Sequence, residues 1–101
     1  MTTKKVFTKE QALEIGRKLG LKWDKFDVEQ FRMGLDVELE HGKDMNLTNV
    51  KKDNPILTGK IALAHLNEFP DYYTRLYIME EEAEHYWKIK NVKEKEKSIS
   101  Q

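Results

Sequence analysis

The chain has 101 residues, 18 basic against 18 acidic side chains, and no cysteine. This length is enough for one core and one domain. The lack of cysteine excludes disulfides, thiolate metal clusters and a cysteine nucleophile. The zero net charge argues against nucleic-acid binding driven by bulk charge. No apolar run has signal-peptide length, and none approaches the roughly 18 residues of a membrane span, so we expect a cytoplasmic protein.

The charges are unevenly distributed along the chain. Residues 1–26 carry seven Lys or Arg against three Asp or Glu, whereas residues 27–50 carry two against six. We interpret this as complementarity between the first two helices. A basic docking patch at the N-terminus is the alternative.

Two helices are predicted to begin with the same local signal. The stretches FTKEQ and FDVEQ each place a capping side chain, Thr8 or Asp27, after an aromatic residue and three positions before a glutamine. This is the pattern of a capping box. The predicted helices are Lys9–Leu19, ended by Gly20 with Ala12, Ile15 and Leu19 inward, and Val28–His41, ended by Gly42 with Val28, Phe31, Leu35 and Leu39 inward.

A long polar loop is predicted at residues 42–54, before a third helix. Asp44, Asn46 and Thr48 resemble the start of a calcium-binding loop, but Pro55 stands where the terminal glutamate would lie, so turn and capping chemistry explains them better. Asn54 and Pro55 begin the third helix, Pro55–Glu68. Its sequence is apolar almost all round, which predicts a buried central helix.

The fourth helix follows the break at Pro70 and is predicted to end at about Lys88. Residues 89–101 have no core-forming pattern and are predicted to be a disordered, charged tail. The expected fold is all-α: a single small four-helix domain at 7–88, with a long loop between the second and third helices, preceded by a flexible N-terminus at 1–6. The predicted inward stripe of the fourth helix is Tyr72, Leu76, Met79, Ala83, Tyr86 and Trp87.

The stretches FDVEQFRMGLDVELEHG and DNPILTGKIALAHLNEFPDYYTRLYIMEEEAE are similar to a family of short bacterial and bacteriophage proteins of unknown function. The resemblance covers about residues 7–84. Its most specific parts are GLDVELEHG, from Gly34, and KIALAHL, from Lys60. It implies a compact domain in a bacterial or phage setting and brings no activity, cofactor or catalytic residue.

The candidate functional residues are pairs of a glutamate and a histidine, spaced so that both lie on the same face of a helix. Glu38 with His41 and His65 with Glu68 each share a helix face, as in the Glu-x-x-His ligand pairs of di-iron bundles. We expect His65 and Glu68 to be mostly buried, because the third helix leaves little of its circumference to water. We also expect at least one of Glu38 and His41 to approach them closely. A hydrogen bond from His65 to a backbone carbonyl, with Glu68 paired or capping, is the favoured explanation; a shared divalent-metal site and simple exposure are the alternatives.

Geometry restricts the metal hypothesis. Both pairs lie near the C-terminal ends of their helices, so they meet only if the second and third helices run roughly parallel. No catalytic triad, phosphate-binding glycine loop or activated lysine is visible, so no catalytic residue is assigned.

The fourth helix is also rich in aromatic residues. Tyr72, Tyr73, Tyr77, Tyr86 and Trp87 allow an exposed ridge for a protein partner, although the amphipathic pattern favours a core position for Tyr72, Tyr86 and Trp87. The sequence thus favours a small non-enzymatic interaction or accessory module over a metal- or ligand-binding domain.

Overall fold

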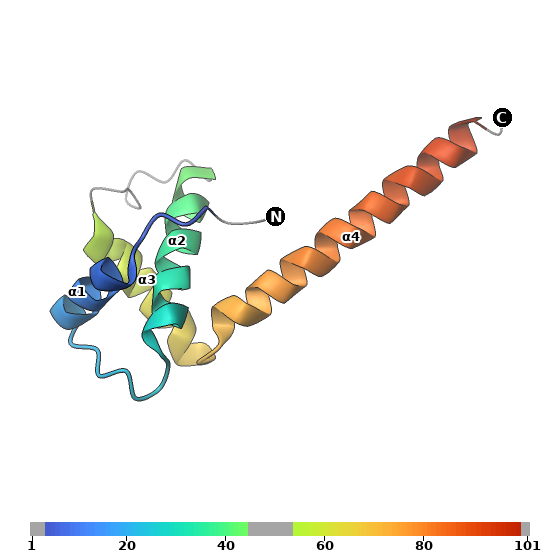
Figure 1. Cartoon of the computed structure of the whole chain (residues 1–101). Coiled ribbons are helices and arrows are strands. Elements are labelled where there is room, and N and C mark those ends of the chain that lie inside the picture. Colours follow the sequence, from blue (N-terminus) through green and yellow to red (C-terminus); the bar gives the residue numbers. More distant parts are fainter. Residues whose placement is uncertain (1–3, 45–53, 100–101) are drawn as a thin grey trace.

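The computed structural model describes residues 4–44 and 54–99, with side chains over 4–42 and 54–95. Four helices and no strand form this part of the chain, which confirms the all-α prediction (Figure 1). The candidate calcium ligands Asn46 and Thr48 lie outside the described residues. The helices are α1 Lys9–Leu19, α2 Val28–Asp44, α3 Pro55–Glu68 and α4 Tyr72–Ile99.

Local capping explains where α1 and α2 begin. Thr8 Oγ1 accepts from the backbone N–H of Gln11 at 3.1 Å, and the Gln11 side chain accepts from the backbone N–H of Thr8 at 2.9 Å. Asp27 Oδ1 accepts from the backbone N–H of Gln30 at 2.9 Å. The predicted bounds of α1 are confirmed, and Gly20 ends this helix in the left-handed conformation, with φ 76°.

The predicted end of α2 at His41 is wrong. The helix continues through Gly42, which is buried, to Asp44. Among the described glycines only Gly20 has a positive φ, so Gly42 does not make the left-handed turn that would end the helix. A glycine inside a helix costs only about 1 kcal/mol relative to alanine, which packing overrides here.

Helices α1, α2 and α3 pack around one core. Trp23, in the connection between α1 and α2, is partly buried against this core, with its ring edge-on to Phe31 at 5.7 Å. The space for that ring comes from Gly16, where a Cβ would lie 2.5 Å from the indole. The buried core residues are Phe7, Ala12, Ile15, Phe31, Leu35, Leu39, Ala62, Leu66 and Tyr73.

Helices α2 and α3 cross at a steep angle, because α2 rises and α3 descends in the view of Figure 1. A Cβ on Gly59 would lie 3.3 Å from Phe31, and a Cβ on Gly34 would lie 3.0 Å from Ala62. One turn further along both helices, His65 meets Glu38. Glu38 and His65 therefore meet beside the crossing point, and the roughly parallel course of the two helices that the sequence required for this meeting is wrong.

The N-terminal segment is fixed to α2 by one carboxylate. Asp36 Oδ1 accepts from the backbone N–H groups of Val6 and Phe7 at 3.1 and 2.9 Å, and Asp36 Oδ2 accepts from Arg32 Nη1 at 2.8 Å. Arg32 Nη1 also donates to the carbonyl oxygen of Phe7 at 3.3 Å. These bonds hold Val6, which the sequence placed in the flexible N-terminus, and seat the buried ring of Phe7.

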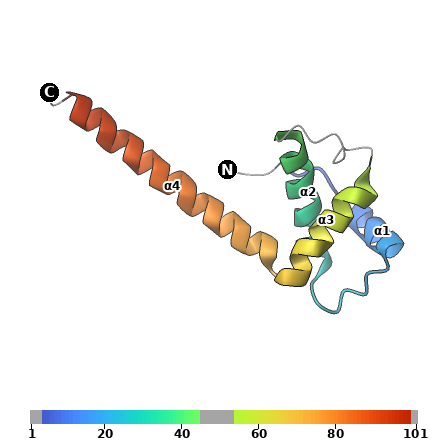
Figure 2. The same ribbon diagram turned by 180° about the vertical axis from the view of Figure 1, so that it is seen from behind.

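Only the beginning of α4 belongs to the packed part of the molecule. Tyr73 is 1 % exposed and fits against Gly34, where a Cβ would lie 2.5 Å from the ring. Leu76 is partly buried. We call helices α1–α3 together with residues 72–76 the body, and residues 77–99 the arm. The arm extends straight away from the body in both views (Figures 1 and 2).

The shape of the chain reflects this arm. The radius of gyration is 17.2 Å, whereas a compact chain of this length has about 13 Å. The predicted inward stripe of α4 is therefore wrong beyond Leu76, because the body ends there and Met79, Tyr86 and Trp87 have no core to face.

The predicted end of the fourth helix at Lys88 is also wrong. The helix runs to Ile99 through the segment from residue 89 that the sequence assigned to a disordered tail. The side chains of residues 89–95 are all exposed, so this segment has no core, as the sequence indicated, and yet is helical. No helix in the described part of the chain is long and apolar enough to cross a membrane.

Candidate functional site

A polar cluster lies where α2, α3 and α4 meet. The Tyr73 hydroxyl donates to Glu38 Oε2 at 2.8 Å, and His65 Nε2 lies 3.6 Å from the same oxygen. The His65 ring stacks on Tyr72, with centroids 4.6 Å apart and planes 15° apart. Each of the three helices therefore contributes to one cluster around the Glu38 carboxylate.

Burial and charge both act on the two tyrosines. Burial raises the pKa of Tyr73 well above its ordinary value, and the negative charge of Glu38 adds to the shift. The pKa of Tyr72 is raised by burial and by the charges of Glu38 and Glu68. Both hydroxyls thus stay protonated at neutral pH, and Tyr73 serves Glu38 as a hydrogen-bond donor.

The structure assembles half of the predicted metal-ligand set. Glu38 is buried and lies close to His65. The prediction that Glu38 or His41 approaches the second pair is therefore confirmed. His65 is partly exposed, at 33 % of its side chain, and Glu68 is exposed, so the predicted burial of Glu68 is wrong. His41 is exposed and lines a different surface, described below.

Geometry explains why Glu68 is not buried. It lies in the last turn of α3, three residues beyond His65, where the helix has already passed α2. Within residues 4–42 and 54–95, no three His, Asp or Glu side chains come together in a way that would hold a metal ion. His65 Nδ1 is buried without a hydrogen-bond partner, so the favoured hydrogen bond from His65 to a backbone carbonyl is not made in the structure.

The arm carries large apolar side chains that are about half exposed. Tyr86 and Trp87 are 58 % and 54 % exposed, and their rings pack edge to face against each other at 5.1 Å. The preference for a core position was therefore wrong for Tyr86 and Trp87, and the exposed ridge is what the structure contains. The other exposed apolar residues of the arm are Tyr77, Ile78, Met79, Ile89 and Val92.

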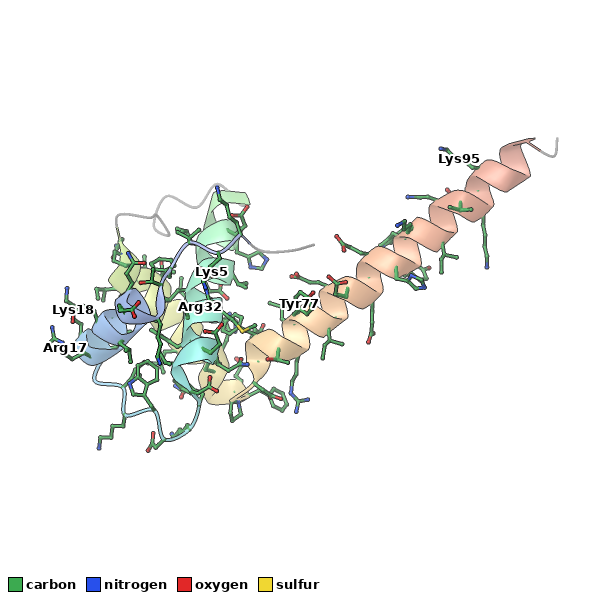
Figure 3. All side chains as sticks on the ribbon, in the orientation of Figure 1. Lys5, Arg17, Lys18, Arg32, Tyr77 and Lys95 are labelled. Atoms are coloured by element: carbon green, nitrogen blue, oxygen red, sulfur yellow. The ribbon has the colours of Figure 1, made fainter. Side chains whose placement is uncertain are left out.

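The view with side chains shows where the exposed apolar surface of the arm begins. Tyr77 emerges at the point where α4 leaves the body, and Lys95 lies far from it near the other end (Figure 3). Nothing in the local pattern signals this change, because the apolar spacing that buries Leu76 continues unaltered into the arm. The sequence does not state how far the body reaches along α4.

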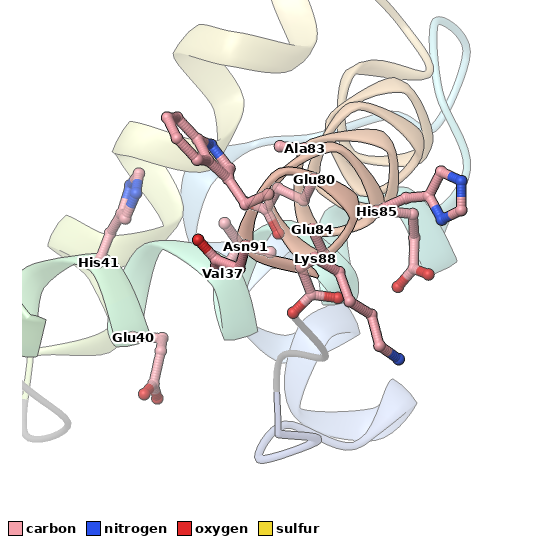
Figure 4. Close-up of a pocket in the computed structure, with 11 residues that line it drawn as sticks. Val37, Glu40, His41, Glu80, Ala83, Glu84, His85, Lys88 and Asn91 are labelled. Carbon is pink, nitrogen blue, oxygen red and sulfur yellow. The ribbon is translucent and has the colours of Figure 1, made fainter. Parts of the chain in front are cut away.

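An open groove of about 900 Å³ lies in the angle between α2 and the arm. Figure 4 shows Glu40 and His41 on α2 across from the residues of α4. The arm side of the groove carries Glu80, Glu81 and Glu84, so the groove is mainly acidic. It is lined by Val37, Glu40 and His41 from α2 and by Glu80, Glu81, Ala83, Glu84, His85, Trp87, Lys88 and Asn91 from α4.

The charges of the arm are separated along its length. Residues 80–84 contain four glutamates and no basic side chain. Residues 88–95 contain four lysines against one glutamate. The arm is therefore acidic near the body and basic toward its far end, with Tyr86 and Trp87 at the boundary.

The resemblance seen in the sequence is borne out by comparison with known proteins. The model of the family described as "Protein of unknown function (DUF5661)" matches residues 12–82, which comprise most of the body and the first turns of α4. Neither the curated proteins nor the solved structures yield a match to this chain. With well over half of its residues matched, the chain belongs to the DUF5661 family of proteins of unknown function.

Proposed function

We propose that this protein is a small, non-enzymatic interaction module of the cytoplasm that binds a protein partner through the arm. The exposure of Tyr86 and Trp87 on a helix that has left its own core carries the proposal. Aromatic side chains dominate the energetics of protein interfaces, because they bury a large area and lose little conformational freedom. A folded helix also presents them in a fixed arrangement, which lowers the entropic cost of binding.

The polar cluster supports a structural role rather than an enzymatic one. The Glu38 carboxylate is 7 % exposed and already accepts the hydrogen bond of Tyr73. A general base must reach a substrate proton, and a buried, occupied carboxylate does not. We therefore assign Glu38, His65 and Tyr73 to the junction that holds the three helices together.

Site-specific photo-crosslinking in cells tests this function. A photoreactive phenylalanine analogue replaces Tyr86 in the arm, and in a control chain it replaces Lys18, which is exposed on α1. We expect irradiation to give a discrete protein adduct from position 86 and none from position 18. Equal yields of adduct from the two positions, or no adduct at all, would contradict an interaction through the arm.

A further inference from the structure

We propose that the partner of the arm is the arm of a second copy of this chain, with the two helices packed antiparallel. This inference rests on the proposed function, since it names the partner for the same surface. Four observations carry it: the spacing of the apolar residues, the separation of charge, the complementary sizes of the side chains and the surface area of the single chain.

One set of side chains on α4 follows the spacing of a helix that packs along another helix. Starting from Tyr72 in the body, successive intervals are four, three, four, three and four residues. This alternation is the a/d repeat of coiled-coil packing. We call the set the seam; its apolar members are Tyr72, Leu76, Met79, Ala83 and Tyr86, and the charged Lys90 takes the next position.

The first two seam residues show what the seam is suited for. Tyr72 and Leu76 are partly buried against the core, whereas Met79 is 59 % exposed and Tyr86 is 58 % exposed. The seam therefore starts as a buried contact and continues without a partner. A second helix laid along the arm would continue the burial that the body begins.

Charge selects the direction of the second helix. Two parallel arms would bring Glu80 and Glu82, which flank the seam, next to the same residues of the other chain. Like charges so placed destabilise a helix pair. Two antiparallel arms instead allow Glu80 and Glu82 of each chain to lie level with Lys90 and Lys88 of the other, which is attractive on both sides of the two-fold axis.

Side-chain size selects the register. Ala83 is the smallest seam residue, and Trp87 is the largest side chain next to the seam. An antiparallel pair with Ala83 of one chain level with Trp87 of the second copy places a large ring over a small residue at two symmetric positions. The same register sets Glu80 level with Lys90 of the second copy, so each dimer gains two complementary charge pairs.

The surface area of the single chain is large enough for such a pairing. The chain exposes 7518 Å², whereas a compact monomer of this mass exposes about 6,000 Å². The excess of roughly 1,500 Å² is more than the roughly 800 Å² per partner that a standard interface buries. The single chain is thus extended by an amount that one helix-on-helix contact accounts for.

Charge exchange in the full-length protein tests the register directly. Sedimentation velocity over a range of concentrations should give the wild-type chain twice its 12.0 kDa mass. Glu80→Lys and Lys90→Glu should each weaken the dimer at least tenfold, and the double variant should regain wild-type affinity within a factor of about three, because the pair is restored with its signs exchanged. Glu81→Lys is the matched control, since Glu81 lies on another side of α4 and should leave the dimer intact.

A second variant separates loss of pairing from loss of folding. Ala83→Glu should give a monomer whose circular dichroism retains the helical signal of the body. A wild-type chain that stays monomeric up to millimolar concentration would overturn the proposal, and so would a double charge variant that fails to recover. In the Tyr86 crosslinking experiment, an adduct of two identical chains supports self-pairing, whereas an adduct with a different protein overturns self-pairing and leaves the interaction module standing.

Discussion

Asp36→Ala should be among the most destabilising single changes in the body. The carboxylate is 5 % exposed and accepts three hydrogen bonds, two from the backbone of Val6 and Phe7 and one from Arg32. Alanine would leave two backbone N–H groups and a buried guanidinium without this acceptor. Removal of one member of a buried ion pair costs about 3–5 kcal/mol, and the remaining bond of Arg32 to Glu29 argues for the lower part of that range.

Urea denaturation followed by circular dichroism measures this loss. With a slope of about 1.5 kcal/mol/M for a chain of this size, the midpoint should fall by about 2 M. Asp36→Asn should fall between wild type and Asp36→Ala, because the amide oxygen still accepts the backbone bonds while the charge opposite Arg32 is lost. Glu14→Ala is the control, since it removes one carboxylate of an exposed pair with Arg17.

Equal midpoints for Asp36→Ala and Glu14→Ala would refute the reasoning. The N-terminal segment would then be held by the ring of Phe7 and by the bond from Arg32 to the Phe7 carbonyl oxygen. Equal urea midpoints for Asp36→Ala and Asp36→Asn, both below wild type, would show that Asp36 stabilises the fold through its ion pair with Arg32. The bonds to the backbone of Val6 and Phe7 would then contribute little.

Three further predictions concern the junction of the helices. Gly34→Ala should destabilise the protein by about 1–3 kcal/mol in the same urea assay, because the new Cβ would lie 2.5 Å from the Tyr73 ring; an unchanged midpoint would contradict this contact. Since the pKa of Tyr73 is raised in the folded state, the unfolded chain loses this proton first, so stability should be full below about pH 10 and decline above it. Tyr73→Phe should flatten that decline and the exposed Tyr77→Phe should not, and equal slopes for both would refute it. Zinc, manganese, iron(II) or calcium should leave the melting temperature unchanged against a chelator control, because only Glu38 and His65 of the four candidate ligands meet; a stabilising shift would restore the metal hypothesis.

Helix starts could be predicted from the sequence because their signals are local. The capping residues Thr8, Asp27 and Asn54 each contact a backbone N–H three positions away, so a few residues contain the whole instruction. The bounds of α1 and α3 agree with prediction for this reason. A helix end at a glycine is a weaker signal, as Gly42 shows, because a glycine also continues a helix when packing favours it.

The extent of α4 could not be predicted, because two physical effects oppose each other there. Residues 89–99 have no core-forming sequence pattern, which argues for disorder, but lysine and glutamate have high intrinsic helix propensity. A helix already nucleated at Tyr72 extends into such residues without a new nucleation cost. In this segment helix propensity and cooperativity outweigh the missing core.

The candidate site was predicted in part. The contact between Glu38 and His65 could be predicted, because each is an ionisable side chain on or beside a buried helix face and needs a polar partner there. The role of Tyr73 as the donor to Glu38 was missed, because a tyrosine in an amphipathic stripe looks the same whether its hydroxyl is bonded or free. Only the position of α4 relative to α2 distinguishes the two cases.

Because α4 is straight, a small rotation at its first residues produces a large displacement at its far end. The helix has 28 residues and is therefore about 42 Å long, yet its fixed end is a short contact in which Tyr73 sits against Gly34. A rotation of only 5° about that contact displaces the far end of the helix by about 3.7 Å, more than the rise of two helical residues. The fit of the Tyr73 ring against Gly34 thus determines the direction in which the arm points. A ligand or substitution that shifts this ring by a fraction of an ångström would change the direction of the whole arm.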